Sequence, residues 1–426
     1  MIRSMGKARV SSCLALGGLC LCAGLLSVSL GFAQEQSEEP LLQLGITTGV
    51  ATSSNRGLDV DRTGSTTELT SRLDFLTRFA TPIQELEFSG DIGLRSVTGA
   101  EDNSLPDGIF EPRLALAYSR EARDARLTAD LFFQEQDISS SELQFNENTA
   151  DFDLLEDTGT QQRVGGDVAL ELRRQSPFGV TLSAGFTTRR FSDADDPDLT
   201  DQDRFRLGAR FRFNLAPDTQ AFLNTRFSTF EDFGTAEGRR ETFSIDGTLR
   251  RDLANGNAVV RSNVTDTEDG TRYTLSAGRT IESAAWAFTG LFGVTRGVTG
   301  RVRPTGEIDV SRSLRNGELS ANLTRTLRSN VDDEEQDVTT VRLGYTTQLS
   351  PLTGLNTSFS FTDRDSDGGG DDGSFGVVSL GIQRAITRDW DLNVALQHRL
   401  REEDEGDTAR DNRLSITLRR DLLVRR

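Results

Sequence analysis

Apolar and polar residues alternate along the stretch from Gln202 to Glu231, and the same pattern recurs along most of the chain. Phenylalanine, leucine and alanine occupy every second position of its first half, and arginine fills most of the positions between them. The apolar series is Phe205, Leu207, Ala209, Phe211, Phe213 and Leu215, and the polar series is Arg204, Arg206, Arg210, Arg212 and Asn214. A turn from Ala216 to Thr219 stops the pattern, which then resumes. A period of two residues predicts a hairpin of two β-strands that each have one apolar face.

The predicted strands are unusually long. Soluble proteins mostly use strands of about five or six residues, whereas roughly nine to eleven tilted residues cross a bilayer as β structure. The alternation predicts about 20 strands, and no fewer than about 18, between Leu41 and Val424. Strands of this length and number are typical of a membrane barrel.

The connections between the predicted strands alternate in length. Tight turns such as Pro217-Asp218 and Asn255-Gly256 carry residues that hairpin turns favour. Longer and acidic connections include Val331 to Asp337 (VDDEEQD), Asp363 to Gly373 (DRDSDGGGDDG) and Arg401 to Asp411 (REEDEGDTARD). About nine tight turns and about ten long loops join the strands, which places both ends of the barrel chain on the tight-turn side.

The apolar faces are expected to point outward. A closed barrel is too wide for side chains to fill once it has many more than about eight strands. Apolar side chains on the outside of such a barrel require lipid, and closure leaves no open strand edge in the hydrocarbon. A solenoid or adhesin would instead show short strands and closely similar repeats. We therefore predict an all-β, transmembrane, antiparallel up-and-down β-barrel with short periplasmic turns and longer acidic external loops, in the cell outer membrane of a Gram-negative bacterium.

The first 33 residues have the features of an export signal. Arg3, Lys7 and Arg9 precede a mostly apolar or small run from Val10 to Phe32, and the small residues before position 34 predict cleavage after Ala33. An uncleaved membrane anchor helix is the alternative. We expect residues 1–33 to be a cleaved signal peptide, residues 34–40 a periplasmic leader and residues 41–426 a single barrel. All three cysteines lie in the first segment, so the mature chain is expected to hold neither a disulfide nor a thiolate site.

Charge and candidate chemistry narrow the function classes. The net charge of −18 argues against nucleic acid as a partner, because nucleic acid needs a basic surface. His398 is the only histidine and lies in the apolar phase of its strand, which argues against a catalytic triad or a zinc site. We expect no enzymatic activity and no cofactor. The sequence from Asp363 copies the opening of a calcium-binding loop, but Ser374 stands where the bidentate glutamate belongs. The weak calcium candidates are Asp363, Asp365, Asp367 and Asp371, and a solvated charge run is the alternative.

Arginine is frequent in the water-facing phase of the strands. The pore-lining candidates are Arg72, Arg78, Arg206, Arg210, Arg212, Arg342, Arg413 and Arg419. Carboxylates such as Asp74, Asp91 and Asp167 share this phase. The charges predict either a cross-strand ladder of ion pairs that stiffens the wall or a charged pore lining that selects solutes. If the lumen is open, we expect a mild preference for anions. Aromatic residues are few in this phase, so a slide for sugars has little support.

The last predicted strand, Arg413 to Leu423 (RLSITLRRDLL), and the triplet Arg420-Asp421-Leu422 carry a family resemblance. Together with the signal peptide, the alternating strands and the acidic loops, they resemble the porin type 2 group of proteobacterial outer-membrane β-barrels. The resemblance implies a porin-like channel for small solutes or an exported polysaccharide. It implies outer-membrane lipid, lipopolysaccharide, the outer-membrane assembly machinery and exopolysaccharide export components as partners. The chain departs from the family pattern because it finishes Val424-Arg425-Arg426 and not on an aromatic residue.

A second function class stays open at this point. A structural or adhesive outer-membrane barrel would have a plugged lumen and would act through its acidic surface loops. The segment from Ser139 to Gly159 is the first candidate for a plug, because its apolar residues could pack inside the barrel. These residues are Leu143, Phe145, Phe152, Leu154 and Leu155. The pattern does not give the oligomeric state.

Overall fold

The computed structural model describes most of the chain. The described residues are 41–58, 60, 64–99, 107–138, 144–146, 151–153, 159–194, 199–234, 239–268, 270–329, 335–366, 372–403 and 408–425. The chain divides into two units, residues 1–38 and 39–426, and all of the described residues belong to the second. The expected signal peptide therefore lies outside the described residues, and the expected boundaries at residues 33 and 40 stay predictions.

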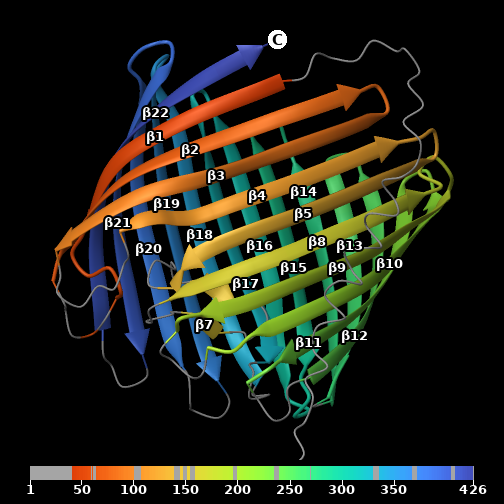
Figure 1. Ribbon diagram of the computed structural model, residues 1–426. Coiled ribbons are helices and arrows are strands. Elements are labelled where there is room, and N and C mark those ends of the chain that lie inside the picture. The colour runs from red at the N-terminus through yellow and green to blue at the C-terminus, as the bar shows by residue number, and fades with distance from the viewer. Residues whose placement is uncertain are drawn as a thin grey trace, which may run out of the picture. The chain divides into compact units, whose positions relative to one another are not determined.

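The second unit is a closed antiparallel barrel of 20 strands (Figure 1). The barrel strands are β1 (Leu41–Ser53), β2 (Thr66–Thr81), β3 (Gln84–Gly99), β4 (Gly108–Glu121), β5 (Ala125–Asp137), β8 (Thr160–Leu172), β9 (Phe178–Ser192), β10 (Gln202–Ala216), β11 (Thr219–Asp232), β12 (Arg239–Leu253), β13 (Gly256–Thr267), β14 (Gly270–Glu282), β15 (Trp286–Arg296), β16 (Val302–Leu314), β17 (Gly317–Ser329), β18 (Glu335–Ser350), β19 (Thr353–Ser366), β20 (Gly373–Ala385), β21 (Trp390–Glu403) and β22 (Thr408–Arg425). Each strand pairs with the next along the chain, and β1 pairs with β22 to close the barrel. The predicted fold class and strand number are confirmed.

Connection lengths follow the predicted alternation with one exception. The tight connections include 217–218, between β10 and β11, and 254–255, between β12 and β13. Gly256 begins β13 with φ +128°, a conformation that favours glycine, which explains the Asn-Gly pair at this turn. The exception is the connection between β13 and β14, which has residues 268–269 alone although it lies on the long-loop side.

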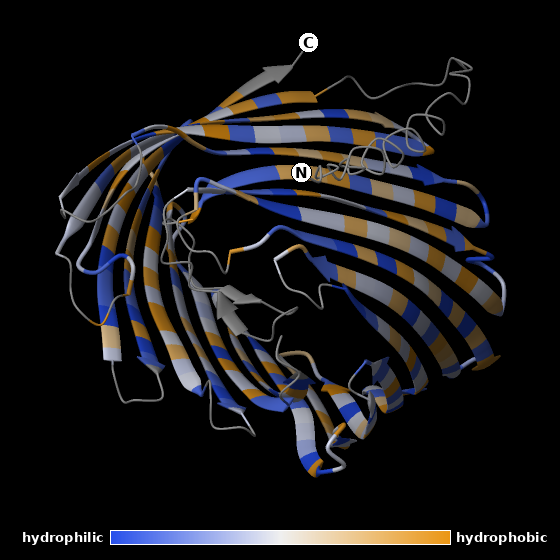
Figure 2. Ribbon diagram, turned by 60° about the horizontal axis from the view of Figure 1, so that its bottom comes forward, coloured by the Kyte–Doolittle hydropathy of each residue, from blue (hydrophilic) through white to orange (hydrophobic). Residues whose placement is uncertain are grey.

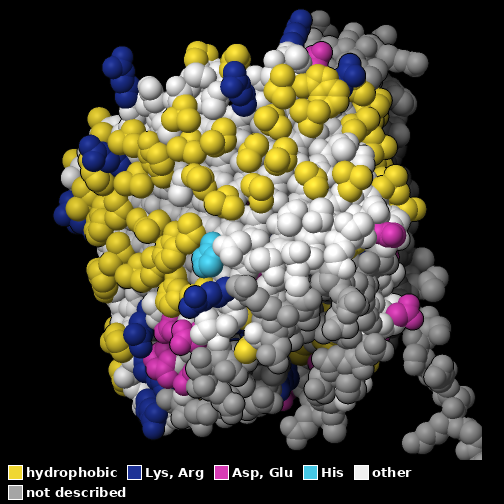
Figure 3. Space-filling model, turned by 90° about the vertical axis from the view of Figure 1, so that its left-hand side faces the viewer, with side chains coloured by type: hydrophobic (Ala, Val, Ile, Leu, Met, Phe, Trp, Pro, Cys, Tyr) yellow, Lys and Arg dark blue, Asp and Glu magenta, His cyan; other side chains and the backbone are white. Residues whose placement is uncertain are grey.

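The apolar face of the barrel points outward, as predicted. Leu73, Leu94 and Phe292 are 47%, 59% and 60% exposed. Figure 2 shows hydrophobic and hydrophilic positions alternating along the strands, and Figure 3 shows hydrophobic side chains gathered in a broad band on one face of the exterior. The few buried hydrophobic side chains among the described residues are Leu58, Phe110, Ile138, Leu327, Val338 and Ala409. The barrel thus presents its apolar surface to its surroundings, as a barrel in lipid does.

Several strands extend into segments that were predicted as acidic loops. β18 already begins at Glu335, β19 continues to Ser366, β21 continues to Glu403, and β22 begins at Thr408. Glu335 is 2% exposed and accepts a hydrogen bond of 2.7 Å from the amide of Val298. Hydrogen-bond donors from other segments thus stabilise acidic side chains within these strands. In the part of the chain that the structure describes, no helix is long and apolar enough to cross a membrane.

Candidate lumenal site

All eight arginines predicted to line the pore occupy inward positions of their strands. Arg206 and Arg210, for example, alternate on β10 with Leu207 and Phe213, which are 44% and 37% exposed on the outer face. The cross-strand register extends this assignment around the barrel, because residues paired across strands share a face. The contribution of these arginines to conduction stays a prediction.

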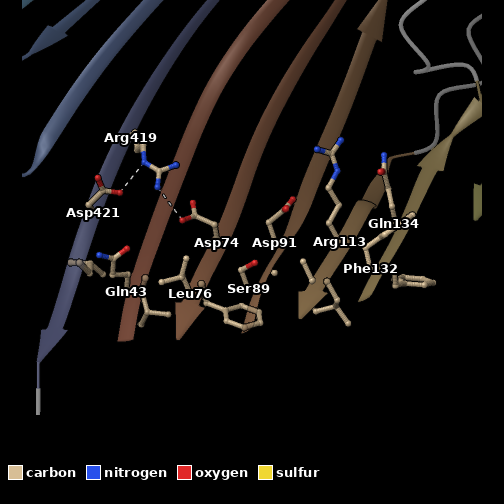
Figure 4. A pocket seen from close by; sticks show the side chains of 17 residues that line it. Gln43, Asp74, Leu76, Ser89, Asp91, Arg113, Phe132, Gln134, Arg419 and Asp421 are labelled. Carbon is tan, nitrogen blue, oxygen red and sulfur yellow. Dashed lines mark hydrogen bonds and ion pairs between the residues drawn. The ribbon is translucent and has the colours of Figure 1, made fainter. Parts of the chain in front are cut away.

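We call the inward positions of β22 and β1 to β4 the acidic wall. There Arg419 bridges two carboxylates, with its Nη2 atom 3.1 Å from Asp74 and its Nε atom 2.8 Å from Asp421 (Figure 4). The acidic wall also carries Glu85, Glu87, Asp91 and Glu111. The charge of Arg419 is therefore shared between two neighbours within the wall.

Three further arginines of the acidic wall are also paired. Arg72 forms ion pairs with Asp91 and, at 3.0 Å, with Glu111. Arg78 pairs with Glu85 at 2.6 Å, and Arg113 lies 3.5 Å from Glu111. A lumen-facing pocket of about 570 Å³ lies along this surface. Its polar lining includes Gln43, Asp74, Ser89, Asp91, Arg113 and Gln134. These contacts form the cross-strand ladder that was one of the two predicted roles.

We call the inward positions of β8 to β11 the basic wall. Its arginines are Arg163, Arg189, Arg204, Arg206, Arg210, Arg212 and Arg226, and its carboxylates are Asp167, Glu171 and Asp232. Arg163 and Arg189 lie directly opposite each other on β8 and β9. Like charges in that position repel and destabilise a sheet, so the fold retains an electrostatic cost at this place.

A small cavity opens among the arginines of the basic wall. Its volume is about 50 Å³, and its lining consists of Arg163, Arg189, Arg204 and Arg206 together with Thr187, Gln202, Asp203 and Phe230. Guanidinium groups present planar pairs of donors that match carboxylate and phosphate oxygens. Such an arrangement of donors is chemically suited to bind a small anion.

Other contacts distinguish the arginines of β10 from one another. Arg206 donates a hydrogen bond of 3.2 Å to Asp167, two strands away, and Gly185 on the strand between them leaves space for both side chains. The guanidinium of Arg210 lies 4.5 Å from the ring centre of Phe222. Arg212 instead donates to the backbone carbonyls of the turn that joins β8 to β9, the shortest of these bonds being 2.7 Å to Arg174. Arg212 therefore holds a turn.

Two predicted candidates lie away from both clusters of contacts. Arg342 faces the lumen on β18, between Asn322 and Ser360 in the register. Arg413 faces the lumen on β22 at the long-loop end, opposite Ser53. Neither forms an ion pair within the described part of the chain.

The barrel is similar to solved receptor barrels of bacterial outer membranes. No family model and no curated protein sequence matches the chain. The siderophore receptor PirA from Pseudomonas aeruginosa has 10% identity and a TM-score of 0.52, with 91% of this chain and 81% of that chain covered. A mutant of the ferric enterobactin receptor PfeA from the same organism has 10% identity and a TM-score of 0.52, with 89% and 80% covered. The outer membrane protein opdK, also from Pseudomonas aeruginosa, has 13% identity and a TM-score of 0.46, with 91% and 99% covered. The chain has an outer-membrane barrel fold.

A buried carboxylate that the alternation of residues does not indicate lies at the seam between the first and last strands. Asp411 on β22 is fully buried and accepts hydrogen bonds from Ser53 Oγ at 2.6 Å and from the amides of Ser54 and Asn55 at 2.9 Å each. Arg399 on β21 donates to its second oxygen from Nη2 at 2.7 Å and from Nε at 3.1 Å. Asp411 therefore fixes the start of the loop between β1 and β2 to the last two strands. Its position in a predicted acidic loop gave no signal for this role.

The same loop places another arginine among inward-facing charges. Arg56 pairs with Glu68, and its carbonyl accepts a hydrogen bond of 2.8 Å from Arg399. Burial, together with the charges of Arg413, Arg95 and Arg399, lowers the pKa of Arg56 to about 9. Arg56 still carries its charge at neutral pH, and the carboxylate of Glu68 offsets that charge.

The remaining predicted sites are only partly covered. Asp363 and Asp365 lie on β19, whereas Asp367 and Asp371 lie outside the described residues. Within the described ranges, no three His, Cys, Asp or Glu residues are grouped so that they could hold a metal ion. The plug candidate, Ser139 to Gly159, is described only in the short paired strands β6 (Gln144–Asn146) and β7 (Asp151–Asp153) and at Gly159.

Proposed function

We propose that the chain is a porin-like channel of the Gram-negative outer membrane that lets small solutes cross and prefers small anions. The observation that carries the preference is the cavity of the basic wall, which is lined by four arginines and a single carboxylate, Asp203. A solute carboxylate or phosphate at this cavity would offset the repulsion between Arg163 and Arg189. The site therefore favours an anion even though the whole chain is acidic.

The difference between the two walls supports this proposal. Arg72 and Arg419 of the acidic wall have their charges offset by Asp74, Asp91, Glu111 and Asp421 at hydrogen-bonding distance. In the basic wall, arginines outnumber carboxylates. Because charges more than roughly 8 Å apart are screened at physiological salt, the nearest wall should dominate what a passing ion senses. The positive field should therefore act mainly along β8 to β11.

Placement in the outer membrane is supported by three observations. The fold is that of an outer-membrane barrel, the exterior is apolar, and the first 33 residues resemble an export signal. We include in the proposal that the short turns face the periplasm, that the assembly machinery inserts the barrel, and that the chain is related to the porin type 2 group.

Small solutes fit the lumen better than a polysaccharide does. Sugar polymers slide along exposed aromatic faces, but arginines cover inward-facing rings here. Arg210 lies 4.5 Å from the centre of Phe222, and Arg163 lies 5.4 Å from the centre of Phe132. A ring that stacks on a guanidinium has one face fewer for a sugar. Polysaccharide export and its partner components are therefore the weaker version of the proposal.

A plugged barrel is the second candidate function. The connection between β5 and β8 carries the two-stranded sheet of β6 and β7, which is separate from the barrel sheet. A connection with its own secondary structure is of the kind that fills or narrows barrels. Such a protein would act through its external loops and would not conduct.

The deciding experiment is the reversal potential of the purified protein in a planar bilayer under a potassium chloride gradient. We expect the wild type to prefer chloride. Arg163→Gln combined with Arg206→Gln should lower the ratio of chloride to potassium permeability by about twofold or more, because it removes charge at the narrow cavity. Arg279→Gln combined with Arg384→Gln is the matched control, since it removes the same charge from the outer face. An equal shift in both pairs would refute a selective basic wall, and absence of conductance would favour the plugged barrel.

A further inference from the structure

The outward face of the barrel carries its charges asymmetrically. Arginines occupy outward positions near the tight-turn ends of six strands, and we call this set the arginine collar. Its members are Arg120 on β4, Arg251 on β12, Arg279 on β14, Arg312 on β16, Arg384 on β20 and Arg420 on β22. Each is exposed and shares the phase of exposed apolar residues, as Arg384 does with Leu380 and Ile382. Figure 3 shows basic side chains along the upper edge of the hydrophobic band.

Carboxylates on the same outward face lie at the opposite end of the strands. Those near the long-loop ends include Asp203, Glu231, Glu241, Asp266, Asp363, Asp365 and Glu402. Within the described strands, no outward position in the tight-turn half holds an aspartate or glutamate. The apolar band is therefore bounded by arginines without carboxylates at the tight-turn edge, and by carboxylates mixed with arginines such as Arg190, Arg239 and Arg296 at the long-loop edge.

Both tryptophans of the chain belong to the cationic edge. The guanidinium of Arg312 lies 4.6 Å from the ring centre of Trp286, which is 44% exposed. The guanidinium of Arg420 lies 5.5 Å from the ring centre of Trp390. Tryptophan concentrates where hydrocarbon meets headgroups, because its ring is apolar and its N–H group is polar. These pairs place the collar at the depth of lipid headgroups.

Most of the collar has hydrogen-bond donors to spare. Arg251 pairs with Asp218 at 3.1 Å, and Arg279 donates to Asn255 at 3.1 Å. Within the described part of the chain, the remaining four form no hydrogen bond or ion pair; these are Arg120, Arg312, Arg384 and Arg420. A guanidinium has five N–H donors, and long side chains extend along apolar surface towards the headgroups. The collar can thus offer donors to phosphate oxygens from several sides of the barrel.

We propose that the arginine collar binds the phosphates of anionic phospholipids in the leaflet that surrounds the tight turns. The apolar band next to the collar contacts the acyl chains, while the guanidinium groups contact the headgroup. Net negative headgroups are preferred over zwitterionic ones, because a zwitterion brings its own cation to the site. Lipopolysaccharide is the less suitable occupant, because the edge that meets the opposite leaflet carries carboxylates, and arginines there such as Arg190 and Arg239 already pair with them. The proposal rests on insertion in a bilayer and not on conduction.

The two tryptophans provide a direct test. Because they are the only two in the chain and each contacts a collar arginine, quenching of their fluorescence by brominated lipids reports which lipid lies beside the collar. The full-length protein is reconstituted in phosphatidylcholine with increasing fractions of brominated phosphatidylglycerol, and the reverse labelling is the comparison. We expect phosphatidylglycerol to bind about fivefold more strongly for each arginine that one headgroup reaches, with the preference falling as salt is raised. Equal quenching by the two brominated lipids would overturn the proposal.

Variants locate the effect. Arg312→Gln, Arg384→Gln and Arg420→Gln together should bring the preference for phosphatidylglycerol close to onefold. Arg163→Gln, Arg206→Gln and Arg210→Gln remove the same charge from the lumen and should leave the preference unchanged. Because two of the collar substitutions adjoin tryptophans, the anionic lipids retained on each purified variant are also counted by native mass spectrometry. Retention of phosphatidylglycerol by the collar variant at the wild-type level would contradict the proposal, as would displacement of phosphatidylglycerol from the wild type by lipid A.

Discussion

The acidic wall and the basic wall contain the same residue type in the same phase, but they use it differently. In the acidic wall, the register and one strand irregularity bring carboxylates to Arg72, Arg78 and Arg419. In the basic wall, the register sets Arg163 opposite Arg189. The comparison teaches that the alternation of a strand decides whether a charge faces the lumen, whereas the register decides whether that charge is offset.

The largest expected effect on stability distinguishes a buried, hydrogen-bonded carboxylate from a solvent-exposed one. Asp411→Ala at the end of the acidic wall should lower the free energy of unfolding by about 3–5 kcal/mol, because it leaves the buried Arg399 without its carboxylate partner. Asp167→Ala in the basic wall should cost less than about 1 kcal/mol, because the Asp167 side chain is 57% exposed. Urea unfolding of refolded protein, followed by tryptophan fluorescence, measures both. Equal losses would mean that the two walls do not differ in this way.

The next effect tests the faces within the basic wall. Phe211→Arg puts a charge on the lipid side of β10 and should cost about 2–4 kcal/mol, whereas Arg210→Gln on the lumen side should be mild. The two positions are neighbours that differ only in phase. Refolding yield and heat-modifiable gel mobility report the difference. If both variants refold equally, the assignment of the faces on β10 is wrong.

The smallest effect has opposite signs in the two walls. Arg419→Gln leaves Asp74 and Asp421 without their shared cation and should cost up to about 1 kcal/mol. Arg163→Gln removes a repulsion with Arg189 and should be neutral or stabilising by about 0.5 kcal/mol. Unfolding at low salt shows both effects most clearly, and salt should reduce them. A stabilising Arg419→Gln would remove the distinction between the acidic wall, where a carboxylate bridge favours the arginine, and the basic wall, where a facing arginine disfavours it.

The strand number and the faces could be predicted from the sequence because a period of two residues encodes them directly. Phe211 and Arg212 differ in phase, and no long-range information is needed to place them on opposite faces. The inward positions of the eight arginines followed for the same reason.

Strand ends and pairing could not be predicted in this way. β18 begins within a predicted acidic loop because Arg303 and Arg325 pair with Asp337 from 3.1 and 2.9 Å. A register shift between Asp91 and Gly93 brings Phe110 and Glu111 to face Arg72, which no local pattern shows. Such contacts join residues far apart in the chain, so they depend on the closed barrel.

The seam at Asp411 also has a consequence for the order of assembly. Its hydrogen bond to Ser53 joins residues 358 positions apart, so it can form only after β22 has been made and has found β1. Earlier hairpins join strands that are close in the sequence and can pair before the whole chain has reached the membrane. The contact between Asp411 and Ser53 forms only when the barrel is complete. A chain truncated before β22 would leave β1 with an open edge and the loop after Ser53 without its acceptor. Only a finished barrel therefore has the contacts of the seam. An unfinished barrel lacks them and would remain exposed to proteases.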